Sequence, residues 1–128
     1  MEIIKLDPEK YAGQKFTARY ATNGYYDIVR TDGGFDIKYK HFDSPVERSF
    51  DDCFFGEWLE APVAYGAFEG DRLLGYVEGA SESWNNRYRI SNICVFDGAN
   101  RHGGIGSALM SAILRDAKES GARMAVLE

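Results

Sequence analysis

The chain has 128 residues, of which 45% are hydrophobic, and it carries a formal net charge of -5 with a pI near 5.1. Because this length can bury one core but hardly two, we expect a single domain over residues 1–128. The acidic balance argues against nucleic acid as the main partner, since phosphate binding needs a concentrated basic surface, and it suits a cationic substrate. No apolar run approaches membrane-spanning length and no signal-peptide pattern is present, so we expect no membrane partner and a cytoplasmic location.

The first half of the chain contains a hairpin pattern. A modest strand is predicted around Lys15–Tyr20, and Tyr25–Arg30 and Phe35–Lys40 then flank the turn residues 31–34. The aromatic residues Tyr25 and Tyr26, like Trp58 and Trp84 further on, are interpreted as core or groove walls, with an aromatic slot for substrate as the alternative.

A helix is predicted to follow the hairpin. Ser44 suits its N-cap, Pro45 its first position and Glu47 a capping box. Four apolar residues recur at a spacing of four, and Ala61-Pro62 ends the pattern; they are Val46, Phe50, Phe54 and Trp58. Cys53 would lie on this helix and Cys94 on a later strand. The two are interpreted as reduced, buried thiols, and we expect no disulfide and no metal site.

The second half predicts an antiparallel meander and then a crossover. Strands are expected over Val63–Phe68, Leu73–Ser81 and Arg87–Phe96, the first two joined by a tight turn at 69–72. An apolar stripe after residue 104 then indicates a helix that Gly121 ends, and a last strand covers Arg123–Leu127. The fold class is therefore α+β, a central mixed sheet in which an antiparallel meander precedes a strand-helix-strand crossover, with helices on both faces.

The glycine-rich segment between the third meander strand and the long helix is the most informative motif. Its sequence is Arg101-His102-Gly103-Gly104-Ile105-Gly106. Glycines let a backbone approach a ligand, and the unpaired amides at a helix start attract anions. A tight turn that needs glycine only for its geometry is the plainer alternative. A P-loop would need a Lys before Ser107, which is missing, and a dinucleotide fold would need Glu128 as its acidic residue after a doubly wound sheet.

In this context the pattern Arg-x-x-Gly-x-Gly resembles the acetyl-CoA-binding motif of the GNAT superfamily of N-acetyltransferases. Residues 83–86, Ser-Trp-Asn-Asn, followed by Ile90-Ser91-Asn92-Ile93-Cys94-Val95, look like the streptothricin-acetyltransferase branch of that superfamily. The resemblance covers Val63 to Glu128 and implies acetyl-CoA as the cofactor. It implies that the backbone of a strand receives the pantetheine arm, that Arg101 positions the loop or pairs with phosphate, and that the loop amides bind the diphosphate. The strand residues are Cys94, Val95 and Phe96, and the loop residues are His102, Gly103, Gly104, Ile105, Gly106 and Ser107.

The resemblance also implies direct attack of an amine on the acetyl thioester, aided by a general base. Ser91 stands where the branch usually carries a carboxylate. The remaining candidates for the base are Glu78, Glu82 and His41, and Glu78 is our choice because its strand face turns toward a cleft. Its plainer interpretation is a solvated strand residue.

The chain differs from the family's pattern in two further ways, and both concern length. The segment Phe96–Asn100 is one residue longer than in the family, which predicts a bulge or a register shift. The sequence stops at Glu128, inside what would be the family's fifth strand, before the tyrosine that acts as general acid. We therefore expect a homodimer or another partner to cover an exposed sheet edge.

The sequence leaves three candidate functions. The first is an acetyl-CoA-dependent N-acetyltransferase that acts on a small-molecule amine. The second is a non-catalytic acyl-CoA-binding or assembly module that retains only the cofactor half of the fold, which Ser91 and the short C-terminal part favour. The third is a nucleotide-binding crossover, against which the missing P-loop lysine argues.

Overall fold

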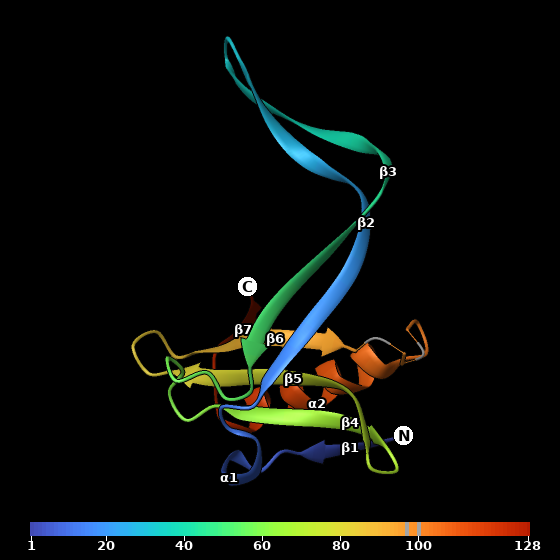
Figure 1. The fold of residues 1–128 in the computed structure, drawn as a ribbon. Helices are drawn as coiled ribbons and strands as arrows, with labels where there is room; N and C mark the ends of the chain where they lie inside the picture. Colours follow the sequence, from blue (N-terminus) through green and yellow to red (C-terminus); the bar gives the residue numbers. More distant parts are fainter. Residues whose placement is uncertain (97, 100) are drawn as a thin grey trace. The chain divides into compact units, whose positions relative to one another are not determined.

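The computed structural model describes residues 1–96, 98–99 and 101–128. It contains two compact units, one formed by residues 1–18 together with 51–128 and the other by residues 19–50. The first unit is built on a five-stranded sheet of order β1-β4-β5-β6-β7, and strands β2 and β3 form a separate two-stranded sheet (Figure 1). The prediction of a single domain stays a prediction.

The meander and the crossover that the sequence predicts are both present. Strands β4, β5 and β6 pair antiparallel, and β6 then pairs parallel with β7 in a register that runs from Arg87↔Met124 to Ile90↔Leu127. The helix α2 connects β6 to β7, which completes the strand-helix-strand unit. The bounds are Val63–Glu69 for β4, Arg72–Glu82 for β5, Arg87–Val95 for β6, Ile105–Glu119 for α2 and Met124–Leu127 for β7.

Two short elements at the start of the chain have no counterpart among the predicted ones. Strand β1 (Glu2–Lys5) pairs antiparallel with β4, and α1 (Pro8–Tyr11) follows it. Asp7 caps α1 by accepting a hydrogen bond of 3.0 Å from the Glu9 amide, and Pro8 occupies the first turn. Four residues are too few for a periodic pattern, so pairing with β4 rather than local sequence defines β1.

The face of the sheet that α2 covers holds the larger hydrophobic core. The apolar stripe of α2 packs on side chains of β4, β5 and β6. Burial of this stripe, more than helix propensity, stabilises a helix of this length. Its members are Ala67, Leu74, Val77, Tyr88, Ile90, Ile105, Leu109, Ile113 and Ala117.

A second core lies among residues of β4, β5 and the segments that precede β2 and follow β3. It is rich in aromatic rings: Phe16 and Phe54 each lie 4.8 Å from the ring of Tyr76, measured between centroids. Rings at such distances prefer edge-on or tilted contacts, as here. The buried members are Leu6, Phe54, Phe55, Ala64 and Tyr76.

The prediction of a helix after the hairpin is wrong. Residues 44–53 belong to β3 (Gly34–Cys53), the partner of β2 (Lys15–Thr31), so Cys53 ends a strand and does not lie on a helix. A spacing of four residues satisfies the two-residue alternation of a strand as well as the helical period, so the apolar pattern did not discriminate between a strand and a helix. Pairing decides the outcome, because the Phe54 amide donates 3.0 Å to the Gln14 carbonyl and the Gly13 amide donates 3.2 Å to the Phe54 carbonyl. Pro45 is tolerated because a two-stranded sheet leaves one side of each strand unpaired.

Strand β7 stands at one end of the five-stranded order. The prediction that a partner covers this edge concerns more than one chain and stays a prediction. Among the described helices, none combines the length and apolarity needed to cross a membrane.

Candidate functional site

The amino terminus of α2 is capped without any side chain. Gly104 is its N-cap with φ of 88°, a left-handed conformation that glycine adopts without strain, and the first turn of the helix contains no acidic residue. Within the described residues, no protein acceptor bonds the amides of Ile105, Gly106 or Ser107. The helix therefore begins with free donors and the positive end of its dipole.

The two glycines also leave room above these donors. A Cβ atom built on Gly104 would meet no heavy atom within 4 Å, and one built on Gly106 would lie 3.9 Å from Cγ2 of Val95. The protein's own packing therefore does not require glycine at 106. A ligand that approaches the backbone does require glycine at this position. The amides of Ile105, Gly106 and Ser107, called the cradle here, therefore fit a diphosphate.

Two arginines hold the loop that leads into this cradle. Arg101 donates from Nη2 to the Val95 carbonyl over 3.3 Å, and Arg72, at the start of β5, donates from Nη2 to the Gly98 carbonyl over 2.8 Å. The contact of Arg101 supports the role of positioning the loop. Arg72 was not among the predicted site residues, because its partner lies 26 residues away along the chain.

The remaining loop residues are exposed. His102 has φ of 66°, which is uncommon for a residue with a side chain, and Gly103 lies with Arg72 and Ile105 along a cavity of about 320 Å³. The left-handed turn at His102 and Gly104 brings successive amides to one side of the loop, which is the arrangement of an anion-binding nest.

Strand β6 contains a bulge next to its predicted ligand-binding stretch. In the β5–β6 register Glu78 pairs with Asn92 but Gly79 pairs with Ile90, so Ser91 is the extra residue. The expected irregularity in Phe96–Asn100 falls partly outside the described residues, which exclude 97 and 100. Ser91 donates 3.3 Å to the Glu78 carbonyl, so it supplies no carboxylate but belongs to the bulge.

The bulge determines which backbone groups of β6 face away from β5. The Phe96 amide donates 2.8 Å to the Leu74 carbonyl, so this amide belongs to the sheet and is not available to a ligand. Because successive residues of a strand face opposite neighbours, the backbone of Val95 points away from β5. The contact of its carbonyl with Arg101 agrees with this direction.

Glu78 is buried, contrary to its plainer interpretation as a solvated residue. It is 1% exposed, and its Oε1 accepts a hydrogen bond of 3.0 Å from the Gly56 amide. Burial raises the pKa of its carboxyl, the Gly56 amide opposes the shift, and the nearby charge of Asp52 adds to it. A carboxyl with a raised pKa is a stronger proton acceptor than an ordinary one once it is ionised.

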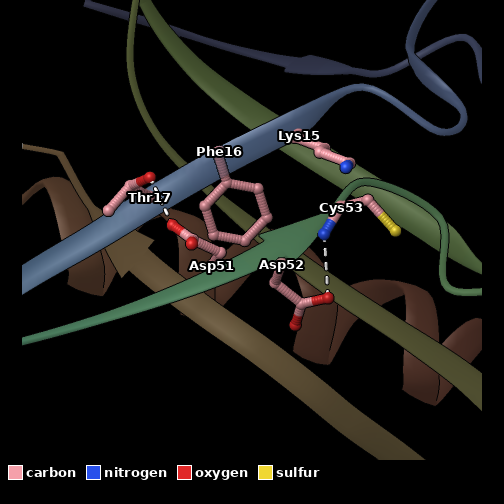
Figure 2. A pocket seen from close by; sticks show the side chains of 6 residues that line it. All are labelled: Lys15, Phe16, Thr17, Asp51, Asp52 and Cys53. Carbon is pink, nitrogen blue, oxygen red and sulfur yellow. Dashed lines mark hydrogen bonds between the residues drawn. The ribbon is translucent and has the colours of Figure 1, made fainter.

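Asn92 connects Glu78 with a cavity of about 640 Å³. Its side chain hydrogen-bonds Glu78, its cross-strand partner, and donates 3.0 Å from Nδ2 to Oδ2 of Asp52. Figure 2 shows Asp52 and the ring of Phe16 on adjacent strands at this cavity. The lining residues are Lys15, Phe16, Thr17, Asp51, Asp52 and Cys53. With two carboxylates and one ammonium group, the lining favours a cation.

Tyr76 adds an unpaired donor to the same region. The residue is fully buried, its ring contacts Phe16, and within the described residues its hydroxyl has no hydrogen-bond partner. Burial raises the pKa of this hydroxyl, and the charges of Glu78 and Asp52 add to the effect. The hydroxyl is therefore neutral and can donate to a ligand.

The other candidates for the base lie elsewhere. Glu82 is paired with Arg87, and that pairing lowers the pKa of its carboxyl, so it is a poor proton acceptor. His41 is in the unit of residues 19–50, with its ring 4.7 Å from that of Tyr39. The interpretation of Trp58 and Trp84 as core residues is wrong, because 64% and 74% of their surfaces are exposed.

The sequence-based site missed Asp52, Asn92, Gly56 and Tyr76. The adjacent Asp51-Asp52 pair was a visible signal, but a helix was predicted for this segment, where the structure has the end of β3. The sequence carries no signal for Asn92, because its place opposite Glu78 depends on the bulge at Ser91.

Comparisons with known proteins agree with this architecture. The sequence model of the acetyltransferase (GNAT) family matches residues 26–128, and no curated protein sequence matches the chain. The crystal structure of nourseothricin acetyltransferase is similar with a TM-score of 0.72 at 22% identity, covering 98% of this chain and 71% of that one. A protein assigned as a streptothricin acetyltransferase of Bacillus anthracis str. Ames, in complex with acetyl coenzyme A, has a TM-score of 0.64 at 17% identity, covering 99% of this chain and 74% of its own. These likenesses confirm the predicted fold.

Proposed function

Because the chain belongs to the acetyltransferase (GNAT) family, whose cofactor is acetyl-CoA, we propose that it transfers an acetyl group to a primary amine of a small molecule. When bound, acetyl-CoA supplies the acetyl group as an activated thioester. The observation that carries the proposal is the start of α2, where Gly104 caps the helix without a side chain and leaves free amides.

Each part of the loop has a distinct task in this proposal. The amides of Ile105, Gly106 and Ser107 would hold the diphosphate, with the helix dipole adding to the attraction. Arg101 acts as a positioning residue, since its guanidinium is bonded to the Val95 carbonyl. The Val95 amide, which faces away from β5, would donate to the thioester carbonyl and stabilise charge that develops there.

Glu78 is the proposed general base. An amine attacks only as the neutral form, so a group near it must take its proton. Direct attack would form the new C–N bond without a covalent enzyme intermediate, while the thioester C–S bond breaks and CoA leaves as a thiolate that takes up a proton. The burial of Glu78, the raised pKa of its carboxyl and its link through Asn92 to Asp52 support this role.

The substrate is proposed to be a cation. Asp51 and Asp52 line the cavity that Asn92 connects to Glu78, and they would attract an ammonium group before its proton is removed. The Tyr76 hydroxyl would supply a hydrogen bond to the same ligand, because it is buried without a partner in the described part of the chain.

Binding and turnover measured separately would test the proposal. Calorimetric titration with acetyl-CoA comes first, followed by a free-thiol release assay over a panel of primary amines. Thiol release with a cationic amine supports the proposed function. Binding without release for every amine would favour the non-catalytic acyl-CoA-binding module, which the Ser91 substitution also favours. No binding at all would contradict both.

We further propose a cytoplasmic location. The sequence has only two cysteines, Cys53 and Cys94, which is fewer than a disulfide framework needs. Proteins without such a framework are typical of reducing compartments.

A further inference from the structure

The unit of residues 19–50, called the arm here, consists of one antiparallel ribbon of β2 and β3. Its turn has two residues, Asp32 and Gly33, which sets Thr31 opposite Gly34 and, counting back, Tyr26 opposite Tyr39. The rings of Tyr26 and Tyr39 lie 5.1 Å apart between centroids, as expected for cross-strand neighbours on one face.

Alternation along the two strands then sorts the outer part of the arm into two unlike faces. One, called the apolar face, contains five large apolar side chains, and Arg30 is its only charged member in the described stretch 26–39. The opposite face carries charged residues, among them Asp27 and Lys40, whose Oδ2 and Nζ lie 2.6 Å apart. The five members of the apolar face are Tyr26, Ile28, Phe35, Ile37 and Tyr39.

The apolar face is exposed in the single chain. Tyr26 and Phe35 are each 74% exposed, Ile37 is 73%, Ile28 is 68% and Tyr39 is 43%. Scattered apolar residues are common on surfaces, but five contiguous ones on one face of a ribbon mark an interaction site. A two-stranded ribbon is also marginal in water unless a further layer packs on it.

We propose that the apolar face of the arm packs against the same face of a second copy of this chain. Aromatic and large aliphatic side chains of this exposure present roughly 500–600 Å² per copy, so a face-to-face pair would bury somewhat more than the ~1,000 Å² that a specific interface needs. The contact is isologous, because each copy offers the same five side chains.

The charge distribution also favours a second copy of this chain as the partner of the arm. The arm holds five Lys or Arg residues and five Asp or Glu residues, so its net charge is zero, although the whole chain carries -5. Two arms can therefore meet without the repulsion that two acidic bodies would experience elsewhere on their surfaces. A basic or acidic macromolecule would gain no such advantage from a neutral arm.

Sedimentation velocity of the full chain over a wide range of concentration tests the proposal. We expect a monomer-dimer equilibrium that Ile28→Thr and Ile37→Thr each weaken at least about tenfold, since both remove apolar contact at the centre of the interface. Threonine is β-branched and keeps strand propensity, so these variants preserve the ribbon. Lys38→Thr, on the opposite face, is the matched control and should change the dissociation constant less than about twofold. Circular dichroism and acetyl-CoA binding confirm that all three variants are folded.

Three outcomes would overturn the proposal. The wild-type chain could be monomeric at every concentration. A dimer could form that neither isoleucine substitution weakens, which would place the contact elsewhere, such as at the β7 edge. The wild-type chain could also remain monomeric and bind phosphatidylcholine vesicles in an Ile37-dependent manner, which would make a membrane surface the occupant. None of these readouts depends on acetyl transfer, so the inference stands or fails apart from the proposed function.

Discussion

The backbone amide of Gly56 donates a hydrogen bond of 3.0 Å to Oε1 of Glu78, across 22 positions of sequence. This contact stabilises the ionised carboxylate, whereas burial disfavours it more strongly, so the pKa of Glu78 lies above its ordinary value. Once ionised, a carboxyl in this balance accepts a proton more readily than an ordinary one. The first two predictions follow from this balance.

Glu78→Gln should lower the rate of acetyl transfer by about 10²–10⁴-fold, because the amide cannot accept a proton from the amine. The Gln side chain can still accept the hydrogen bond from Gly56, so acetyl-CoA affinity should not change. Steady-state rates across pH provide the measurement: the wild-type rate should rise as Glu78 ionises, and the variant should lose this rise. Glu82→Gln, on the same strand, is the control. Equal pH profiles for the wild type and Glu78→Gln would exclude Glu78 as the base.

The same variant should change the pH dependence of stability. A carboxyl whose pKa is raised by folding binds more protons in the native than in the unfolded state, so stability falls as pH rises from the ordinary value of 4.5 through the raised one. Glu78→Gln removes this contribution. Urea unfolding at several pH values should therefore show the variant gaining stability relative to wild type as pH rises. A difference that is constant with pH would contradict the raised pKa.

Gly106→Ala separates the two interpretations of the glycine loop. A Cβ at this position meets only Val95 at 3.9 Å, and alanine favours helix over glycine by about 1 kcal/mol, so the free protein should become more stable. Acetyl-CoA binding should nevertheless weaken strongly, because the methyl group occupies the space of the diphosphate. Thermal unfolding and calorimetry measure the two effects. Ser111→Ala, further along α2, is the control: it raises helix propensity away from the amides of the first turn and removes only the hydrogen bond of 2.8 Å from the Ser111 hydroxyl to the Ser107 carbonyl. Unchanged affinity in Gly106→Ala would favour a turn that needs glycine only for its geometry.

Arg72→Ala should reduce acetyl-CoA affinity about fivefold, the value of one hydrogen bond of ~1 kcal/mol, because the Gly98 carbonyl loses its donor and the loop is less well positioned. Arg115→Ala removes a positive charge from the exposed side of α2 and should have little effect. Calorimetry at low and high salt checks the mechanism. If Arg72 acted as a direct phosphate ligand, its contribution would diminish with salt, in contrast to a positioning role.

Two tyrosine-to-phenylalanine substitutions should have opposite signs. The Tyr88 hydroxyl donates 2.9 Å to Oδ2 of Asp116 and joins β6 to α2, so Tyr88→Phe should lower the free energy of unfolding by about 1.5 kcal/mol. The buried Tyr76 hydroxyl has no partner among the described residues, so Tyr76→Phe should leave the free chain as stable or up to about 1 kcal/mol more stable. Denaturant unfolding measures both. If Tyr76→Phe destabilises the chain as much as Tyr88→Phe, the hydroxyl has a structural partner and is not a free donor for a ligand.

The sequence by itself determined the second half of the fold and singled out the glycine loop as a candidate anion site. The strands from Val63 to Val95, the helix after Gly104 and the parallel strand at its end were predictable, because alternation, turn residues and helical spacing are local signals. The glycines of residues 103–106 likewise indicate an anion site through their chemistry alone.

Tertiary structure decided the rest, because the remaining signals depend on pairing. A spacing of four residues fits both periods, so pairing with β2 makes residues 44–53 a strand, and Asp52 then bonds Asn92, the cross-strand partner of Glu78. The burial that raises the pKa of Glu78 involves segments distant in the sequence, such as the one that brings the Gly56 amide to its carboxylate, and no local pattern specifies it. Short-range periodicity depends on neighbouring residues. Burial and cross-strand pairing instead depend on segments that are distant in the chain and meet only when it folds.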